Sequence, residues 1–553
     1  MNHRKNKLIE ENFFIIDSNN LEKIESHLYG FIISNKGILT DNYYKLLGKY
    51  EEPDPFGAYV MIRKISYEIR LDQDFYGSFG IYIYKNKDTD YFALSNSFLL
   101  LEEYLHTNQN LSFNKDFADN FIISELCTPS IYETMINEIE KLPSNIFLTI
   151  NIENKKLNTY LIDYKENTIP LESEEGLKII DKWVDKWGYI FRSLKHKTDN
   201  IFMDLSGGFD SRVVLSILIN SGVDLNSILI NSLTDKNHGH DEDFKIANNI
   251  ASKFAFKINN FTLDNNCTIW GLKDNLFCSM YSKLGFHKEF YFRKGFFTKP
   301  RFGFTGGGGE IIRGVPSNPI KDYLKSISLL GRKIKGHEEE FFKSSIRLCN
   351  RSVIRLMQKK IYNNDKEVTL NFYSQGRARS HFGTLVVEGF LTNIYIIQPL
   401  MDPEIKRIKY DIIGNSTHDF IAFIYVRFAR RLIDFPFQGQ RKLNLESIKK
   451  AEILNNNLSH YEIKTDFNPN YFIDNSRKSP IPQEINNQKL EEYLKNLFKS
   501  SKFYRTINTI YDNKVYDWAI EYINKSNYFP LRHGYALLAI ATTLEYLSKK
   551  NNK

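Results

Sequence analysis

Short apolar runs broken by turn-forming residues characterise residues 13 to 165. Each run is rich in β-branched and aromatic residues, and Gly, Asn, Asp or Pro separates it from the next. Side chains of this kind pack well on a pleated surface, so the runs predict strands joined by turns. The predicted strands cover residues 31–34, 58–62, 78–84 and 145–152.

The periodicity changes at residue 174. Apolar residues recur at helical spacing between Leu177 and Trp187. Beyond them, apolar runs alternate with amphipathic helical patterns, and this alternation predicts an α/β fold with a parallel, doubly wound sheet. The runs lie at 200–205 and 227–231, and the helical patterns at 210–221 and 241–254. From residue 340 the chain is predicted to be mostly helical, with a polar, Asn-rich loop at 454–487.

The hexapeptide Ser206–Ser211, SGGFDS, lies where the first of these strands gives way to a helix. A helix start presents unpaired backbone N–H groups and a dipole that favours anions. Gly207 and Gly208 have no Cβ to obstruct a close approach to phosphate. The two serines add hydroxyl donors, and Asp210 offers a hard oxygen ligand for Mg²⁺. The alternative is an ordinary glycine turn with a helix cap; the GxxxxGK[ST] and dinucleotide patterns are absent.

A second glycine cluster, TGGGGE, occupies Thr305–Glu310 and follows the short apolar run 302–304. Ligands of open α/β sheets bind at the carboxyl ends of the strands, which is where this cluster is predicted to lie. A flexible surface loop is the alternative interpretation.

These two segments resemble the SGGxDS loop of the PP-loop ATP pyrophosphatases and the Ser-Gly-x-Gly-x-Asp segment of the asparagine synthetase family. The resemblance implies cleavage of ATP into AMP and pyrophosphate, with Ser206–Ser211 gripping the pyrophosphate. It places Leu205 and Ser232 beside the adenosine. Thr305 and Gly306 would contact AMP.

The same resemblance implies a shared Mg²⁺ between Asp210 and Glu310, where Glu310 replaces the family's aspartate. Gly307 departs from the pattern, because asparagine synthetases have a glutamate there and β-lactam synthetases a tyrosine. The segment 398–402, QPLMD, resembles the family's R-x-PFLD without its arginine. Lys442 is the candidate for the lysine that balances charge on the adenylate and pyrophosphate in relatives.

The amino-terminal part resembles the glutaminase half of glutamine-dependent asparagine synthetases at residues 57–60, 70–77 and 91–97. The resemblance implies an α+β, Ntn-type antiparallel domain at 1–170, followed by the synthetase domain with its helical carboxyl-terminal region at 171–553. Glutaminase chemistry needs a cysteine directly after the initiator methionine, and position 2 is Asn2. We therefore expect no glutamine hydrolysis, as in β-lactam synthetases and lasso-peptide macrocyclases.

Composition narrows the range of partners. Lys and Arg number 74 and Asp and Glu 66, and this net charge of +8 does not indicate a nucleic-acid partner. The amino terminus is not expected to be a signal peptide, and the apolar run 420–425 is too short to span a bilayer. Four cysteines without CxxC spacing favour a reducing, cytoplasmic location: Cys127, Cys267, Cys278 and Cys349.

The histidine and acidic cluster at 238–243 has no metal-site spacing, and acidic residues are ordinary in the first turn of a helix. We expect a ligase that uses ATP and Mg²⁺ to adenylate a carboxylate on a small molecule, sugar acid or peptide and to transfer it to an amine. A homodimer is compatible with the sequence. The alternatives are a PP-loop enzyme that modifies tRNA and a non-catalytic scaffold of the asparagine-synthetase type.

Overall fold

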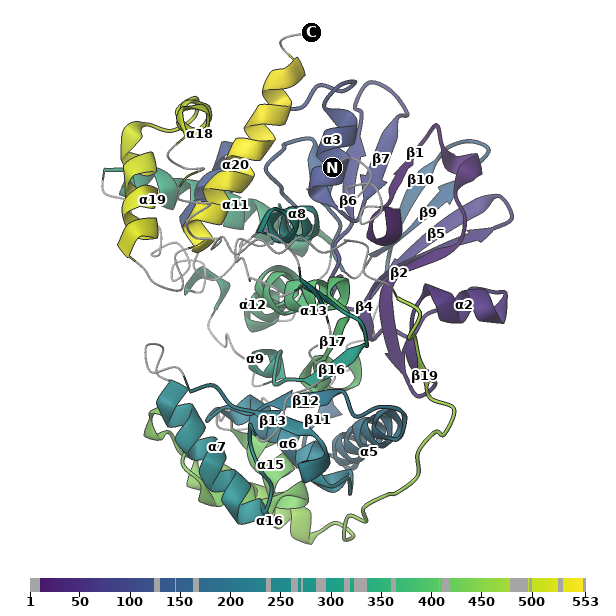
Figure 1. Ribbon diagram of the computed structural model, residues 1–553, viewed down its shortest axis with the longest axis vertical. Coiled ribbons are helices and arrows are strands. Elements are labelled where there is room, and N and C mark those ends of the chain that lie inside the picture. Colours follow the sequence, from purple (N-terminus) through teal and green to yellow (C-terminus); the bar gives the residue numbers. More distant parts are fainter. Residues whose placement is uncertain are drawn as a thin grey trace.

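The computed structural model describes most of the chain and arranges it around several sheets with many helices (Figure 1). The described residues are 10–123, 130–144, 146–162, 169–234, 240–259, 267–269, 272–284, 295–312, 319–322, 336–359, 365–406, 408–409, 418–477, 496, 500–525 and 531–550. No helix in these ranges combines the length and apolar character needed to cross a membrane.

Two sheets form the amino-terminal part, at the upper right of Figure 1. The first is antiparallel in the order β1 (Ile15–Asp17), β7 (Phe92–Ser95), β6 (Tyr82–Lys85), β8 (Ile139–Lys141). The second has the order β10 (Leu157–Leu161), β9 (Ile146–Asn151), β5 (Glu68–Gln73), β4 (Gly57–Ile65), β2 (His27–Ser34), β3 (Gly37–Leu39), β19 (Phe472–Ile473). Its last strand, β19, pairs parallel to β3, so residues far along the chain extend this sheet.

Strand β4 shows why its sequence reads as a continuous apolar run. Ala58, Val60 and Ile62 point into the main core, whereas Tyr59 and Met61 belong to a smaller core cluster on the other face. Helix α2 (Asp41–Leu47) contributes Tyr44 to that second cluster. A strand buried on both faces needs apolar residues at every position.

The predicted strands at 31–34 and 58–62 are confirmed within β2 and β4, and the strand predicted at 145–152 is confirmed over Ile146–Asn151, the extent of β9. The strand predicted at 78–84 is only partly correct, because β6 begins at Tyr82. The residues just before β6 form a turn instead, because the carboxylate of Asp74 accepts hydrogen bonds from the backbone N–H groups of Tyr76 and Ser78. Gly77 and Gly80 have positive φ in that segment, which is turn geometry rather than strand.

The second predicted region forms a parallel four-stranded sheet in the order β13 (Leu229–Asn231), β12 (Ile201–Asp204), β16 (Arg301–Phe304), β17 (Ile394–Ile397), in the lower half of Figure 1. The predicted mixed α/β class and the strand–helix alternation at 200–254 are therefore confirmed. The helices of this region are α5 (Glu174–Lys197), α6 (Phe209–Asn220), α7 (His240–Phe254), α13 (Thr384–Leu391), α15 (Asp419–Phe428) and α16 (Leu445–Asn456).

The remaining elements connect or cover these sheets. The helices among them are α3 (Phe98–Leu105), α4 (Lys115–Ile123), α8 (Leu272–Lys283), α9 (Gly309–Ile312), α11 (Glu338–Lys359), α12 (Asp365–Tyr373), α14 (Pro403–Lys406), α18 (Ser501–Ile507), α19 (Asn513–Lys525) and α20 (Leu531–Lys550). Two small sheets pair β11 (Ile169–Pro170) with β18 (Ile408–Lys409) and β14 (Cys267–Ile269) with β15 (Gly295–Phe297). A π-helical segment, η5 (Ser374–Gly383), joins α12 to α13.

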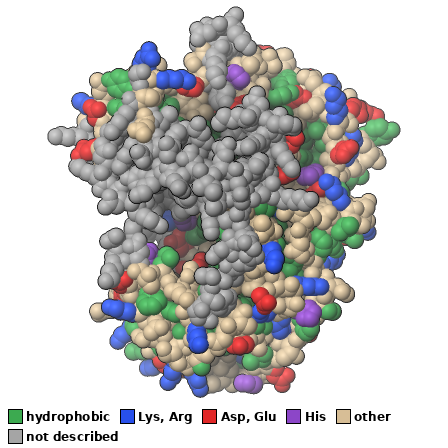
Figure 2. All heavy atoms as spheres, in the orientation of Figure 1, with side chains coloured by type: hydrophobic (Ala, Val, Ile, Leu, Met, Phe, Trp, Pro, Cys, Tyr) green, Lys and Arg blue, Asp and Glu red, His purple; other side chains and the backbone are tan. Residues whose placement is uncertain are grey.

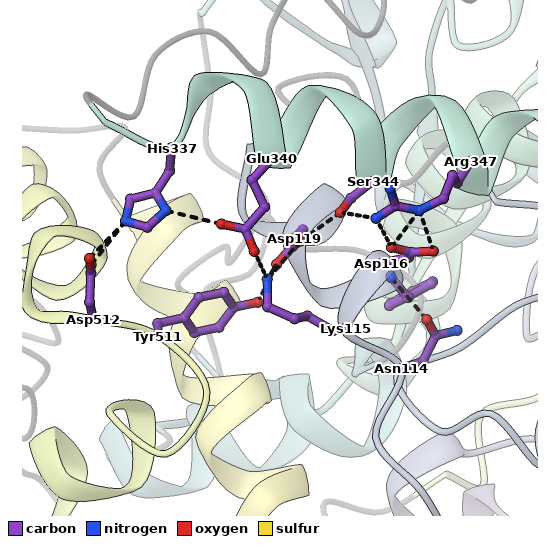
Figure 3. A network of polar contacts seen from close by, with 11 residues as sticks. Asn114, Lys115, Asp116, Asp119, His337, Glu340, Ser344, Arg347, Tyr511 and Asp512 are labelled. Atoms are coloured by element: carbon purple, nitrogen blue, oxygen red, sulfur yellow. Dashed lines mark hydrogen bonds and ion pairs between the residues drawn. The ribbon is translucent and has the colours of Figure 1, made fainter.

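A polar network fastens the carboxyl-terminal helices to the amino-terminal part (Figure 3). Asp119 on α4 is fully buried, and its carboxylate accepts hydrogen bonds from Tyr511 (2.8 Å), Ser344 (2.7 Å) and Lys115 (3.0 Å). His337 bridges Glu340 and Asp512 at the edge of the same network. Helices α4 and α11 and the loop before α19 are thereby held together.

We expect Tyr511→Phe to lower the free energy of unfolding by about 1.5–3 kcal/mol, because it removes one donor to a buried carboxylate. Denaturant unfolding of parent and variant measures the change. Tyr504→Phe is the matched control, since the Tyr504 hydroxyl donates to Asn513 at an exposed site. Equal losses in the two variants would contradict a special role for Asp119.

Candidate functional site

The carboxyl ends of the four parallel strands meet at one edge of the sheet. Met203 pairs with Phe304, and Phe304 pairs with Ile397, while Asp204 pairs with Asn231. The residues that directly follow the strands therefore lie side by side. They are Leu205, Ser232, Thr305 and Gln398, and the edge is the usual ligand edge of an α/β sheet.

A cavity of about 540 Å³ opens at this edge. Its wall includes eight of the residues predicted from sequence: Leu205, Ser206, Gly208, Asp210, Ser211, Ser232, Gly306 and Glu310. It also includes Asp204, Asn231, Leu233, His240, Asp243, Gly307, Gly309 and Phe382. Figure 2 shows the molecule hollowed between its lower part and the rest, with acidic and histidine side chains visible inside the hollow.

Hydrogen bonds between residues of the Ser206–Ser211 loop stabilise its conformation. The Ser206 N–H donates to the Ser211 hydroxyl (3.1 Å), and the Gly208 N–H donates to the Ser206 hydroxyl (3.2 Å). Gly208 is the N-cap of α6, and a glycine has no side chain of its own to cap the helix start. The start of a helix at the wall of a cavity favours an anionic ligand, because the first backbone N–H groups and the positive end of the helix dipole lie there.

Asp243 is a loop-positioning residue that the sequence did not reveal. Its Oδ1 accepts the Gly207 N–H at 2.7 Å, and its Oδ2 lies 3.3 Å from Nδ1 of His240. The acidic start of α7 therefore holds the loop in place. Gly207 is buried, and a Cβ at this position would stand 2.7 Å from the carboxylate of Asp243.

The histidine and acidic cluster does not form a metal site among the described residues, where no three His, Cys, Asp or Glu side chains come together to hold a metal ion. His238 lies outside those residues.

The second glycine cluster packs directly against the first loop. A Cβ on Gly306 would lie 2.6 Å from the Ser211 backbone nitrogen, and one on Gly309 would lie 2.1 Å from Cγ of Asp210. Gly308 has a φ of +85° and faces Met401. The glycines are therefore required by the close approach of two loops and are not a feature of a loose surface segment.

Gly307 has a packing reason of its own. A Cβ at this position would stand 2.4 Å from Nε2 of Gln398, which is buried and has no hydrogen-bond partner in the described part of the chain. The side chain of Gln398 fills the space that a side chain at position 307 would need. Thr305 is not part of the cavity wall, although Gly306 next to it is, and the Thr305 hydroxyl accepts the Gly307 N–H at 3.4 Å.

Asp210 and Glu310 both line the cavity, one from each loop. Mg²⁺ at phosphate-transferring sites is held by one or two carboxylates together with phosphate oxygens and water. Two carboxylates beside the start of helix α6 fit that donor set. Glu310 is itself held in place, because the Tyr373 hydroxyl donates to its Oε2 and Nη2 of Arg377 lies 3.9 Å from the same oxygen.

Ser232 marks the opposite end of the cavity. Its hydroxyl is buried and has no hydrogen-bond partner among the described residues, while its backbone N–H donates to Asn259 (3.0 Å). Buried hydroxyls are rarely left unpaired in native proteins. A ligand with a polar group at this end would satisfy it.

Lys442 is exposed and is not part of the cavity wall, so its role stays a prediction. The segment before it does reach the site, because the Gln438 N–H donates to the Gly207 carbonyl at 3.0 Å. Buried Arg212 fastens this segment to the loop by donating to the carbonyls of Phe435 (3.1 Å) and Gly207 (3.3 Å). Burial lowers the pKa of Arg212 to about 10.

The two ends of the QPLMD segment, Gln398 and Asp402, contact different parts of the protein. Gln398 reaches the glycine cluster, whereas Asp402 accepts the Trp187 indole N–H at 3.0 Å and pairs with Lys186 at 2.9 Å. Asp402 thereby anchors helix α5 under the sheet. Tyr373, Arg377 and Phe382 have no recognisable motif, and only the tertiary structure identifies them as part of the site.

No protein-family model matches the chain, and no curated protein is similar to it at a significant level. The geometry of the site therefore carries the functional argument.

Proposed function

We propose that the chain is an ATP-dependent carboxylate–amine ligase of the asparagine-synthetase type, with a PP-loop nucleotide site. One observation carries the proposal: two loops from adjacent parallel strands close on each other through glycines and place Asp210 and Glu310 on one cavity. A helix start, serine hydroxyls and two carboxylates at one cavity are groups that suit a triphosphate with Mg²⁺.

In the proposed reaction the Ser206–Ser211 loop binds the β- and γ-phosphates. A substrate carboxylate oxygen attacks the α-phosphorus, the bond to the bridging oxygen breaks, and pyrophosphate leaves into the loop, whose donors stabilise its charge. Asp210 and Glu310 would hold Mg²⁺, which neutralises phosphate charge and orients the α-phosphate. An amine then attacks the acyl carbon, and AMP leaves with the electron pair of the broken C–O bond.

The end of the cavity at Ser232 is the proposed nucleoside side, and the end at Glu310 and Phe382 is the proposed acyl and amine side. The carboxylate belongs to a small molecule, a sugar acid or a peptide. Gly307 has no side chain that could accept a proton, so the proton that the amine loses on forming the amide passes to another group of the protein or to the substrate.

The test is thermal unfolding with and without Mg·ATP, for the parent chain and for Asp210→Ala. At a hundredfold excess over Kd, bound ATP should stabilise the native parent by roughly 2.7 kcal/mol. Asp210→Ala should lose this stabilisation, because the proposed Mg²⁺ of the Mg·ATP complex loses one of its protein ligands. Asp241→Ala is the control: Asp241 lies on α7 between the wall residues His240 and Asp243 but is not itself part of the cavity wall, and the variant should respond as the parent does.

No stabilisation of the parent by Mg·ATP would refute the ligase proposal in favour of the scaffold alternative. Binding of tRNA that weakens steeply with salt would instead favour the tRNA-modifying alternative.

A further inference from the structure

The π-helical segment η5 joins the amino-terminal part of the molecule to the nucleotide cavity. Helices α12 and α13, which flank it, lie between the amino-terminal sheets and the parallel sheet (Figure 1). π-helical turns are rare and occur frequently at functional sites. The two sides of η5 make contacts with different parts of the protein.

One side of η5 is seated in the amino-terminal part. Arg379 is fully buried and donates from Nε to the Gly77 carbonyl (2.8 Å) and from Nη1 to the Leu142 carbonyl (2.7 Å). Oε1 of Gln375 accepts both the backbone N–H and the hydroxyl of Ser144 at 3.0 Å. We name residues 73–78 and 142–144 the socket.

The socket is itself a preorganised structure. Asp74 is buried and accepts the N–H groups of Tyr59 (3.2 Å) and Ser78 (2.8 Å) and the Ser78 hydroxyl (2.9 Å). Gln73 ties the two parts of the socket together by donating to the Pro143 carbonyl at 2.7 Å. Gln73 and Asp74 belong to the segment 70–77 that resembles the glutaminase half, and the proposed ligase chemistry gives this segment no role.

The other side of η5 reaches the cavity. Phe382 lines its wall, and Arg377 pairs with Glu310, whose Oε2 also accepts the hydroxyl of Tyr373 at the end of α12. Arg377 and Arg379 are two positions apart on one helical segment, so a displacement at Arg379 moves the groups that hold Glu310.

We propose that Arg379 and Gln375 are positioning residues through which the amino-terminal part seats η5 and so fixes Glu310 at the cavity. The amino-terminal part would then serve as a frame for the nucleotide site and not as a glutaminase. The structural half of this inference stands without ATP; only the consequence for Mg²⁺ rests on the proposed function.

The first test is hydrogen exchange followed by mass spectrometry on Arg379→Met and on the milder Ser144→Ala, which removes one donor to Gln375 with little loss of volume. Ser193→Ala is the matched control, since Ser193 is equally buried but bonds within α5 and to Asn468. We expect faster exchange of the backbone amides at 374–383. We also expect it at 309–312, a segment that contains neither substituted residue. Faster exchange confined to the socket, or equal changes in Ser193→Ala, would overturn the inference.

The second test measures the Mg²⁺ concentration that gives half of the stabilisation by ATP. Arg379→Met should raise it by about 10-fold or more, as expected when the support of a metal ligand is lost. In the double variant Arg379→Met with Arg377→Met the effects should not add, because both act through Glu310. Additive effects, or an unchanged Mg²⁺ requirement in a parent that binds ATP, would count against the proposal. A parent that does not respond to ATP would refute the proposed function, while the exchange result would still decide the inference.

Discussion

At the proposed Mg·ATP site, the Gly309→Ala variant should require about 10- to 100-fold more Mg²⁺ for ATP binding than the parent. The added Cβ would stand 2.1 Å from Cγ and 2.2 Å from Oδ1 of Asp210, which no real pair of atoms tolerates. Gly309 has no positive φ, so the alanine itself adopts this backbone without strain. The whole side chain of Asp210 must shift, because its Cβ would also lie 2.7 Å from the added methyl group, and the carboxylate then leaves the place where it would hold the metal.

Titration of Mg²⁺ at fixed ATP, with thermal unfolding as the readout, measures this effect. Gly188→Ala is the matched control, because it adds the same methyl group inside α5, where its nearest neighbour is the end of the Arg192 side chain at 3.2 Å. We expect Gly188→Ala to keep the parent's Mg²⁺ requirement. An unchanged requirement in Gly309→Ala would show that Asp210 does not ligate the metal.

Replacing Glu102 by glutamine should stabilise the protein at pH 8 by an amount on the order of 4 kcal/mol and flatten its pH dependence. Glu102 on α3 is fully buried against α20, and the hydroxyl of Thr543 donates to its Oε2 at 3.2 Å. Its Oε1 has no hydrogen-bond partner in the described residues. Burial raises the pKa of Glu102 to about 8, from an ordinary value of 4.5.

The direction of the change in stability with pH follows from how many protons the folded and unfolded chains bind. Between pH 4.5 and about 8 the unfolded chain has released this proton while the folded chain keeps it, so stability falls as pH rises through that window. Glutamine has no charge to acquire and removes the slope. Unfolding midpoints of parent and variant at pH 5, 6.5 and 8 would measure it, with exposed Glu153→Gln as the control. A parallel pH dependence in parent and Glu102→Gln would contradict the prediction.

Local pattern was sufficient for the elements that build the site. The apolar run at 200–205, the glycines and the amphipathic run after them are a strand, loop and helix in the structure, because each signal depends on neighbours within a few residues. The strand expected at 78–80 is instead a turn, because Asp74 offers the backbone an alternative set of hydrogen bonds. That competition is not visible in the hydrophobic pattern.

The sequence by itself determined the α/β class, the Ser206–Ser211 loop at a helix start, and the presence of Asp210 and Glu310 as acidic groups beside glycine-rich turns. These follow from side-chain periodicity and from the chemistry of single residue types. Only the tertiary structure decided that the second glycine cluster packs on Asp210, that Asp243 holds the first loop, and that Tyr373 and Arg377 hold Glu310. These contacts join residues far apart in the chain: Gly207 and Asp243 are 36 positions apart, and Glu310 and Tyr373 are 63. Their pairing depends on strand order and helix placement, and no short stretch of sequence encodes either.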